Sequence, residues 1–307
     1  MTTALITHPD CLNHVNPPGA PEQVARLTYV LRALEDLDLL RLEAPKANDA
    51  QIARVHDAGY IASIPGKIPS QGHNWLDGDT YLSPGSLDAI YRSAGGAVQA
   101  VDTVMAGEAD NAFVATRPPG HHAEQATPMG FCTFGNIAIA AKHALDVHGL
   151  TRVAVLDFDV HHGNGTQALL QDDPRVFFVS SHQSPLWPGS GMRNETGPHG
   201  TIMNMPLEPG SGREVMMRKW DTALKRVAEH KPEMILISAG FDAHQDDPLA
   251  NLRWTSADFA DLTRNILTLA QNLCQGRVVS VLEGGYDLDA LARATRAHIE
   301  ELMKATA

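Results

Sequence analysis

The sequence predicts an α/β fold in which a parallel sheet is covered by helices on both faces. From about residue 112 onward, short apolar runs alternate with segments whose apolar residues recur every three or four positions. The 307 residues contain 43% hydrophobic side chains, which is enough for a large core. No internal repeat or break in composition divides the chain, so a single domain over residues 1–307 is the simplest organisation.

The first third of the chain is expected to contain one short strand, three helices and a long loop. Residues 5–7 form the strand, and residues 22–40 have apolar positions on one helical face. A short helix is expected over 49–64, and proline and glycine predict a loop over 65–85. Ser83 should cap the third helix, which then has Pro84 at its first position and ends near Met105.

The remaining two thirds predict an alternation of strands and helices. Apolar runs predict strands at 112–116, 153–156, 176–180, 234–238 and 278–282. Helical periodicity predicts helices at 135–148, 166–171, 214–230 and 255–274, followed by a final helix, and residues 182–200 read as a loop.

Composition limits the class of protein. The formal net charge of -12 argues against a nucleic-acid-binding surface as the main function. The three cysteines are far apart, so they predict neither a disulfide framework nor a paired-cysteine zinc site. No signal peptide and no membrane span is recognisable, which predicts a cytoplasmic protein without a membrane partner. The sequence leaves open whether the protein forms a homo-oligomer.

The most informative stretch is residues 157–166, which directly follows the apolar strand 153–156. Residues two apart on an extended chain face the same way, so Asp157, Asp159 and His161 should project to one side. Two carboxylates and an imidazole together would be costly to bury unless a divalent metal compensates them.

Polar motifs follow three further apolar strands at the same end. His121 and His122, Asp242, and Tyr286 come after the strands that end near residues 116, 238 and 282. In open α/β sheets, ligands bind outside the carboxyl ends of the strands. The four motifs therefore predict one shared site.

These residues fit metal-assisted hydrolysis of an amide or ester. Asp159, His161 and Asp242 form a three-ligand set that leaves one position open, as catalytic zinc requires; iron(II) or cobalt(II) would fit the same donors. His121 and His122 would move protons, with Asp157 behind one and Asn164 behind the other. The Tyr286 hydroxyl would face a developing oxyanion.

Other residues have a weaker case. His162 is interpreted as structural, and His182 follows a strand end and could line the site. Cys132 is more typical of a packed residue than of a nucleophile, because no base is committed to it. The glycine-rich segments match neither a dinucleotide fingerprint nor a phosphate-binding loop.

The motifs resemble those of the zinc-dependent histone deacetylases, in the family's order and over nearly the whole chain. They are Arg-Pro-Pro-Gly-His-His (117–122), Gly-Phe-Cys (130–132), Asp-Phe-Asp-Val-His-His-Gly-Asn-Gly-Thr-Gln (157–167), Ser-Ala-Gly-Phe-Asp-Ala-His (238–244) and Glu-Gly-Gly-Tyr (283–286). Asn164 resembles the class II branch and its bacterial homologues, the histone deacetylase-like and acetylpolyamine amidohydrolases. The resemblance implies the arginase–deacetylase fold, with an eight-stranded parallel sheet.

The resemblance also implies roles for individual residues. One catalytic zinc ion would be held by Asp159, His161 and Asp242, with His122 as general base and acid and His121, backed by Asp157, as its electrostatic partner. Tyr286 would polarise the acyl carbonyl. The substrate tunnel would be formed by Gly130, Phe131, Trp187, Leu249 and Gly284, and a structural potassium ion would bind Asp157, Asp159, His161 and Ser180.

The chain departs from the family pattern at the substrate entrance. The usual His-Pro-Glu near the N-terminus reads Ala20-Pro21-Glu22, although Arg26 is kept, and the rim aspartate has no secure counterpart at 79–83. Polyamine-selective relatives place a glutamate where this chain has Leu249, which predicts acylated lysine rather than acetylpolyamine as the substrate. An acid at the rim would have to come from Asp77, Asp79 or Glu195.

Two other readings compete with a deacetylase of acetylated lysine or another acetylated amine. A dinuclear manganese hydrolase like arginase shares the fold but needs further ligands, and Asn164 stands where an acid would help. An inactive acyl-lysine binding module would be expected to lack a ligand or the tyrosine, and this sequence retains all of them.

Overall fold

The computed structural model describes residues 1–304 and is built around an eight-stranded sheet in the order β2-β1-β5-β10-β9-β6-β7-β8. Every pairing in this sheet is parallel, which confirms the predicted fold class. The strands are β1 (Thr3–Thr7), β2 (Leu40–Glu43), β5 (Asn111–Val114), β6 (Val153–Asp157), β7 (Val176–Gln183), β8 (Ile202–Leu207), β9 (Ile235–Ala239) and β10 (Val278–Leu282). A separate antiparallel pair joins β3 (Asn74–Trp75) to β4 (Tyr81–Leu82).

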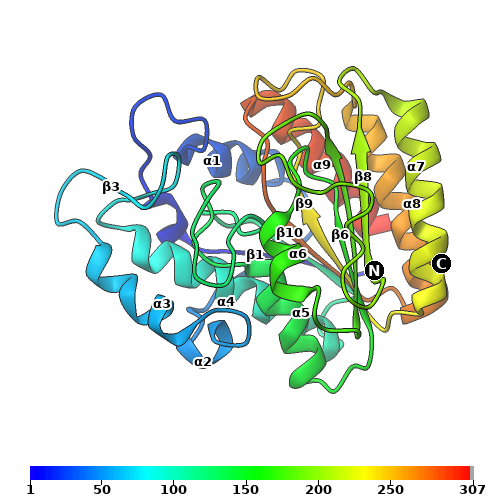
Figure 1. Cartoon of the computed structure of the whole chain (residues 1–307), viewed down its shortest axis with the longest axis horizontal. Helices are drawn as coiled ribbons and strands as arrows, with labels where there is room; N and C mark the ends of the chain where they lie inside the picture. The colour runs from blue at the N-terminus through cyan, green and yellow to red at the C-terminus, as the bar shows by residue number, and fades with distance from the viewer. Residues whose placement is uncertain (305–307) are drawn as a thin grey trace.

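Helices cover both faces of the sheet (Figure 1). One face packs against α4 (Ser86–Met105) and α5 (Asn136–Asp146), with the short helices α2 (Asp49–Ile52) and α3 (Ala58–Ser63) beyond them. The other face packs against α1 (Val24–Ala33), α7 (Arg213–His230), α8 (Ser256–Cys274) and α9 (Leu288–Lys304). The remaining helical segments are α6 (Asn164–Leu170), η1 (Pro9–Leu12) and η2 (Pro65–Lys67). Within residues 1–304, no helix is both long and apolar enough to cross a bilayer.

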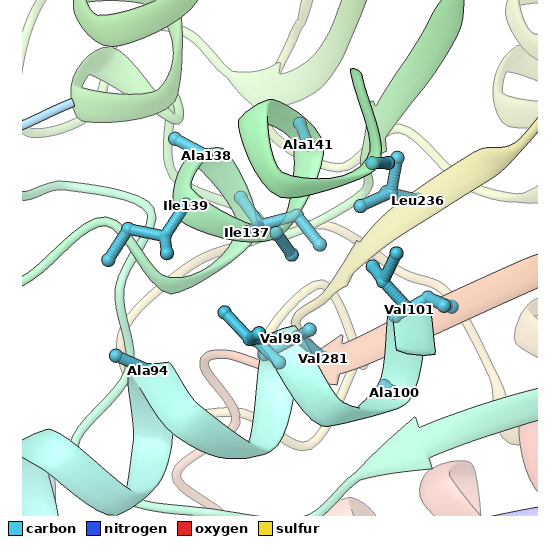
Figure 2. Close-up of a cluster of buried hydrophobic side chains, with 14 of the residues drawn as sticks. Ala94, Val98, Ala100, Val101, Ile137, Ala138, Ile139, Ala141, Leu236 and Val281 are labelled. Carbon is cyan, nitrogen blue, oxygen red and sulfur yellow. The ribbon is translucent and has the colours of Figure 1, made fainter. Parts of the chain in front are cut away.

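The core on the α4–α5 face shows why these segments are helical. Val98 and Val101 of α4 lie opposite Ile137 and Ala141 of α5, with Leu236 of β9 beside them (Figure 2). All five side chains are buried. Alanines on both helices allow close approach, and burial of each larger aliphatic side chain contributes about 1.5–3 kcal/mol.

The N-terminal helix predictions were partly wrong. The helix expected over 22–40 ends at Ala33, and the chain then turns into β2, an edge strand whose exposure alternates along its length. The segment 49–64 forms two helices, because Asp57 caps a second start. Helix α4 begins at Ser86 after Gly85, where a Cβ would lie 2.4 Å from the Asn13 carbonyl oxygen. Ser83 instead hydrogen-bonds to residues 13–15 and to Ser86, so it does not cap the helix.

The structure adds strands at or next to the two segments predicted as loops, residues 182–200 and 65–85. Strand β7 extends to Gln183, and β8 pairs with it beyond the loop, although Asn204 and Pro206 interrupt its apolar pattern. The loop 65–85 contains η2 and the β3–β4 pair. These short elements depend on tertiary partners rather than on periodicity.

The strand order explains why the polar motifs meet. The four strands that precede them, β5, β10, β9 and β6, are consecutive neighbours at the centre of the sheet. Their carboxyl ends therefore open on one edge, flanked by the loops after β5 and β7.

Candidate active site

The proposed metal ligands converge after β6 and β9. Nδ1 of His161 lies 3.2 Å from Oδ1 of Asp159 and 3.2 Å from Oδ2 of Asp242. All three side chains are buried, and their ligand atoms lie within 4.8 Å of one another. One imidazole N–H shared between two carboxylate oxygens makes only two long contacts of 3.2 Å, whereas a divalent ion is bound well by all three side chains.

Backbone N–H groups orient the two carboxylates. Asp242 Oδ1 accepts from the N–H of Val160 at 2.8 Å, and Asp159 Oδ2 accepts from that of Gly284 at 2.8 Å. The remaining oxygens face His161. Bonds of roughly 2.0–2.1 Å at tetrahedral angles place ligand atoms roughly 3.3 Å apart, so the three side chains fit a zinc-sized divalent ion.

The electrostatics also favour a cation at this position. Burial, reinforced by Asp159, raises the pKa of Asp242 to about 7. Burial lowers the pKa of His161, but hydrogen bonds with Asp159 and Asp242 outweigh it and raise that pKa to about 10. The cluster thus holds excess negative charge that a proton or a metal ion compensates.

The two histidines after β5 have different partners. Nδ1 of His121 lies 3.0 Å from Oδ2 of Asp157, whereas Nδ1 of His122 lies 2.7 Å from Oδ1 of Asn164. The rings lie next to each other, with centroids 3.9 Å apart, and the His122 ring lies 5.9 Å from that of His161. The structure therefore brings the histidine pair to the candidate metal ligands, as the sequence predicted.

Because their partners differ, His121 and His122 also differ in pKa. Burial lowers the pKa of His121, but Asp159 and Asp157 outweigh it and raise that pKa well above its ordinary value. Burial lowers the pKa of His122 well below the ordinary value, assisted by the positive charges on His121 and His161. One imidazole is thus held protonated and the other neutral, which is a suitable pair for proton transfer.

Tyr286 follows β10 on a turn held by two groups. The Arg26 guanidinium lies 5.0 Å from the centre of the Tyr286 ring and donates from Nε to the Gly285 carbonyl oxygen at 2.6 Å. Asp247 Oδ2 accepts from the Tyr286 N–H at 2.7 Å. Burial, then Asp242, raises the pKa of Tyr286 well above its ordinary value, so the hydroxyl stays a hydrogen-bond donor.

Aromatic rings border the space in front of these groups. The Phe131 ring centroid lies 5.9 Å from that of Tyr286, and the Trp187 centroid lies 4.7 Å from that of His122. Gly130 packs between His122 and Trp187, where a Cβ would lie 2.4 Å and 2.6 Å from their rings. The Phe131 backbone is left-handed, with φ of 67°. Phe131 and Trp187, which were predicted as tunnel walls, therefore lie next to Tyr286 and His122.

Residues 77–80 hold this wall in place. Asp79 Oδ1 accepts from the Gly130 N–H at 3.0 Å, and Thr80 Oγ1 accepts from the Phe131 N–H at 3.0 Å. Asp77 in turn accepts from the N–H groups of Asp79 and Thr80. The structure thus brings Asp79 to the wall and leaves Asp77 behind it.

The other residues predicted for the tunnel or its rim lie in three different surroundings. Gly284 touches the metal ligands, because a Cβ there would lie 2.1 Å from Asp242 Oδ2. Leu249 is 37% exposed and sits on the Asp247 turn, which links it to the Tyr286 loop. Glu195 accepts from Gln167 and from backbone N–H groups at 191–192 within its own loop, so it is not a free acid at the rim.

Three other polar residues lie beneath the site. Ser180 is the register partner of Asp157 and hydrogen-bonds to His182, which also contacts the Gly191 carbonyl oxygen. His162 lies 2.9 Å from Ser190 Oγ and 3.0 Å from Gln167 Oε1. Both histidines thus anchor the loop that carries Trp187. Cys132 is buried, and its thiol contacts the Gly130 carbonyl oxygen.

Sequence reasoning assigned no role to Glu283, Glu22 and Arg117, three buried ionisable residues that support the site. Glu283 accepts from the N–H groups of Gly120 and His121 and so fixes the histidine loop. Glu22 pairs with both Arg26 and Arg117, and the two arginines lower its pKa to about 2 against the effect of burial. The available signal was position, since Glu283 and Arg117 lie inside motifs that immediately follow strands.

A second group of histidine and aspartate lies between α4 and α5, away from these residues. Asp102 Oδ1 lies 2.6 Å from Nε2 of His143 and 2.7 Å from Nε2 of His148. Asp102 is about half exposed, with 49% of its side chain accessible.

Several proteins with a similar sequence carry the name of a deacetylase or amidohydrolase. The histone deacetylase domain family matches residues 20–302. The chain is 39% identical to the histone deacetylase-like amidohydrolase of Pseudomonas aeruginosa, over 94% of this chain and 79% of that protein. It is 35% identical to the human polyamine deacetylase HDAC10, over 99% of this chain but 48% of that protein.

The fold comparison agrees. The crystal structure of the HDA15 HD domain superposes with a TM-score of 0.92 at 28% identity, over 98% of this chain and 89% of that one. The chain therefore belongs to the histone deacetylase family and has the arginase–deacetylase fold, so the resemblance seen in the sequence is confirmed. Membership supports hydrolysis of an acylated substrate.

Proposed function

We propose that this protein is a zinc-dependent deacetylase that removes acetyl or related acyl groups from the side-chain nitrogen of lysine. The observation that carries the proposal is the buried set Asp159, His161 and Asp242, whose ligand atoms are spaced for one divalent ion. Asp159, His161 and Asp242 would hold such an ion, which when bound would polarise the acyl carbonyl and lower the pKa of a water molecule. Iron(II) or cobalt(II) would suit the same donors.

The surrounding residues supply the proton transfers. His122, neutral and hydrogen-bonded to Asn164, takes a proton from the attacking water and returns it to the leaving amine. His121, held protonated by Asp157, stabilises negative charge next to it. Tyr286 donates from its hydroxyl to the acyl oxygen, which becomes an oxyanion when water adds to the acyl carbon.

The entrance favours an acyl-lysine side chain over an acetylpolyamine. Phe131 and Trp187 offer aromatic walls to a methylene chain, and Leu249 offers no charge to a distant ammonium. An ammonium held against leucine would lose hydration without a partner. The net charge of -12 would attract any polycation, but its electric field is screened beyond ~8–10 Å at physiological salt. Local contacts at the entrance should therefore decide which substrate is preferred.

Acetylpolyamine hydrolysis is the second candidate, because HDAC10 is a polyamine deacetylase by name. The test compares kcat/KM for an acetyl-lysine peptide, acetylputrescine and acetylspermidine. We expect the peptide to be preferred, and Leu249→Glu to raise relative activity on acetylspermidine while Leu249→Gln does not. A tenfold preference of the wild type for either polyamine would reject the acyl-lysine assignment and point to Asp79 as the acid near the entrance.

Three further expectations belong to this proposal. Residues 1–307 act as one deacetylase domain, with residues 305–307 outside the described structure. A structural potassium ion binds at Asp157, with Ser180, Asp159 and His161 around it; the β6–β7 register that places Asp157 beside Ser180 supports it. The protein acts in the cytoplasm.

A further inference from the structure

A cavity of about 550 Å³ is lined by residues of α7, the edge strand β8 and the loop before it. Its lining residues are Phe177, Arg193, Thr196, Gly200, Ile202, Met203, Asn204, Met205, Arg218, Lys219, Thr222 and Arg226. None of them belongs to the catalytic site. Its volume is in the range of small-molecule sites, roughly 300–1,000 Å³.

The cavity is positively charged although the protein carries a net charge of -12. Arg193, Arg218, Lys219 and Arg226 line it, and the lining residues include no acid. Within residues 1–304, neither Arg193 nor Lys219 has a carboxylate within 4.0 Å. Burial, then the charges of Arg193 and Arg218, lowers the pKa of Lys219. Arg193 and Lys219 therefore lack an acidic partner among the described residues, whereas Arg218 lies 3.9 Å from Glu214 and Arg226 lies 3.3 Å from Glu229.

The rest of the lining combines apolar side chains with three polar residues, Thr196, Thr222 and Asn204. Phe177, Ile202 and Met205 are buried beside the cations. Asn204 is 3% exposed; its amide nitrogen donates to Gln167, while Oδ1 has no hydrogen-bond partner among the described residues. Cations on one side and aromatic and aliphatic groups on the other suit an organic anion better than a simple inorganic one.

We propose that this cavity binds a phosphorylated organic molecule of nucleotide size. Guanidinium groups pair with phosphate through two parallel hydrogen bonds, and three of the four cations are arginines. Phe177 and the neighbouring aliphatic side chains would receive an apolar or ring portion. A nucleic acid fits less well, because the rest of an acidic surface would repel its backbone. The inference does not depend on the proposed deacetylase mechanism.

The test measures binding of ATP, tripolyphosphate and adenosine to the full chain by titration calorimetry. We expect one ATP per chain, weaker tripolyphosphate binding and no detectable adenosine binding. Arg193→Ala combined with Lys219→Ala should weaken ATP binding at least tenfold. Lys225→Ala is the matched control, because Lys225 is on α7 but outside the cavity, and it should change affinity less than twofold.

Asp242→Ala separates this site from the candidate metal centre, where ATP could also be held, and it should retain ATP binding. Circular dichroism of each variant checks that the fold is kept. No ATP binding to the wild type would overturn the proposal, as would equal losses in the cavity variant and the Lys225→Ala control. Tripolyphosphate binding as tightly as ATP would overturn the assignment of an organic ligand.

Discussion

Two clusters in this protein each combine histidine and aspartate, yet their geometries differ. At Asp159, His161 and Asp242 the nitrogen and oxygen atoms are 3.2 Å apart, the side chains are buried and backbone N–H groups fix the carboxylates. At Asp102, His143 and His148 the separations are 2.6 and 2.7 Å and the aspartate is half exposed.

The spacing distinguishes the candidate metal centre from the cluster around Asp102. Ligands of one tetrahedral ion are held roughly 3.3 Å apart by their bonds to it, whereas a charged N–H···O contact closes to about 2.7–2.9 Å. Both clusters contain metal-ligating residue types, but only the first has the spacing and the burial that a bound ion would explain. Residue type alone would therefore overpredict metal sites.

The largest expected effect comes from removing one ligand of the buried cluster. Asp242→Ala should abolish turnover and reduce bound metal from one ion per chain to a small fraction, because two ligands remain and an oriented oxygen is lost. Metal analysis and a fluorogenic acetyl-lysine assay measure both quantities. Asp102→Ala is the matched control and should retain both; full metal occupancy and activity in Asp242→Ala would contradict the ligand assignment.

Removal of the neutral histidine should cost less. His122→Ala should lower kcat by roughly 2–4 orders of magnitude, the usual range for a general acid–base, and leave the metal bound. His143→Ala is the control: it removes a histidine next to Asp102 and should leave kcat within twofold. A loss below tenfold in His122→Ala, together with a much larger loss in His121→Ala, would reverse the two roles.

Tyr286 tests whether turnover and metal binding can be separated at the buried cluster. Tyr286→Phe should lower kcat ~100- to 1,000-fold, because one donor to the oxyanion is lost. KM and metal content should change little, since the ring and its contacts with Arg26 and Phe131 remain. Activity near that of the wild type would show that the hydroxyl is dispensable.

The smallest effect is expected at the cluster of Asp102, His143 and His148. Burial raises the pKa of Asp102, but hydrogen bonds from His143 and His148 outweigh it and keep that pKa below its ordinary value. The ionised Asp102 therefore stabilises the fold above pH ~4 and loses this effect as the pH falls through its folded pKa. Because the group is half exposed, Asp102→Asn should cost at most ~1 kcal/mol at pH 7.

Urea unfolding of the wild type and Asp102→Asn at pH 7 and near pH 3 measures this difference. The gap in free energy of unfolding should narrow at the lower pH, because Asp102 loses its charge progressively as the pH falls toward and through its folded pKa. A gap that is constant with pH would mean that packing, rather than charge, stabilises the cluster.

The sequence by itself determined the alternation of elements and the residues of the site. Apolar strands 153–156 and 278–282 are recognisable because a strand buried on both faces needs an uninterrupted apolar run. The candidate ligands and candidate catalytic groups directly follow such strands, so their convergence followed from the parallel topology. The two imidazoles were expected to differ in basicity, because the sequence predicts Asp157 behind one of them and Asn164 behind the other.

Tertiary structure decided everything that depends on partners distant in sequence. Strands β2 and β8 are edge strands whose pairing stabilises sequences without a clear pattern, so periodicity missed them. Glu283, Glu22 and Asp247 gain their roles from backbone N–H groups and arginines that only the fold brings to them. The cationic cavity likewise joins β8, α7 and a loop, because charge in sequence carries no information about which side chains share a surface.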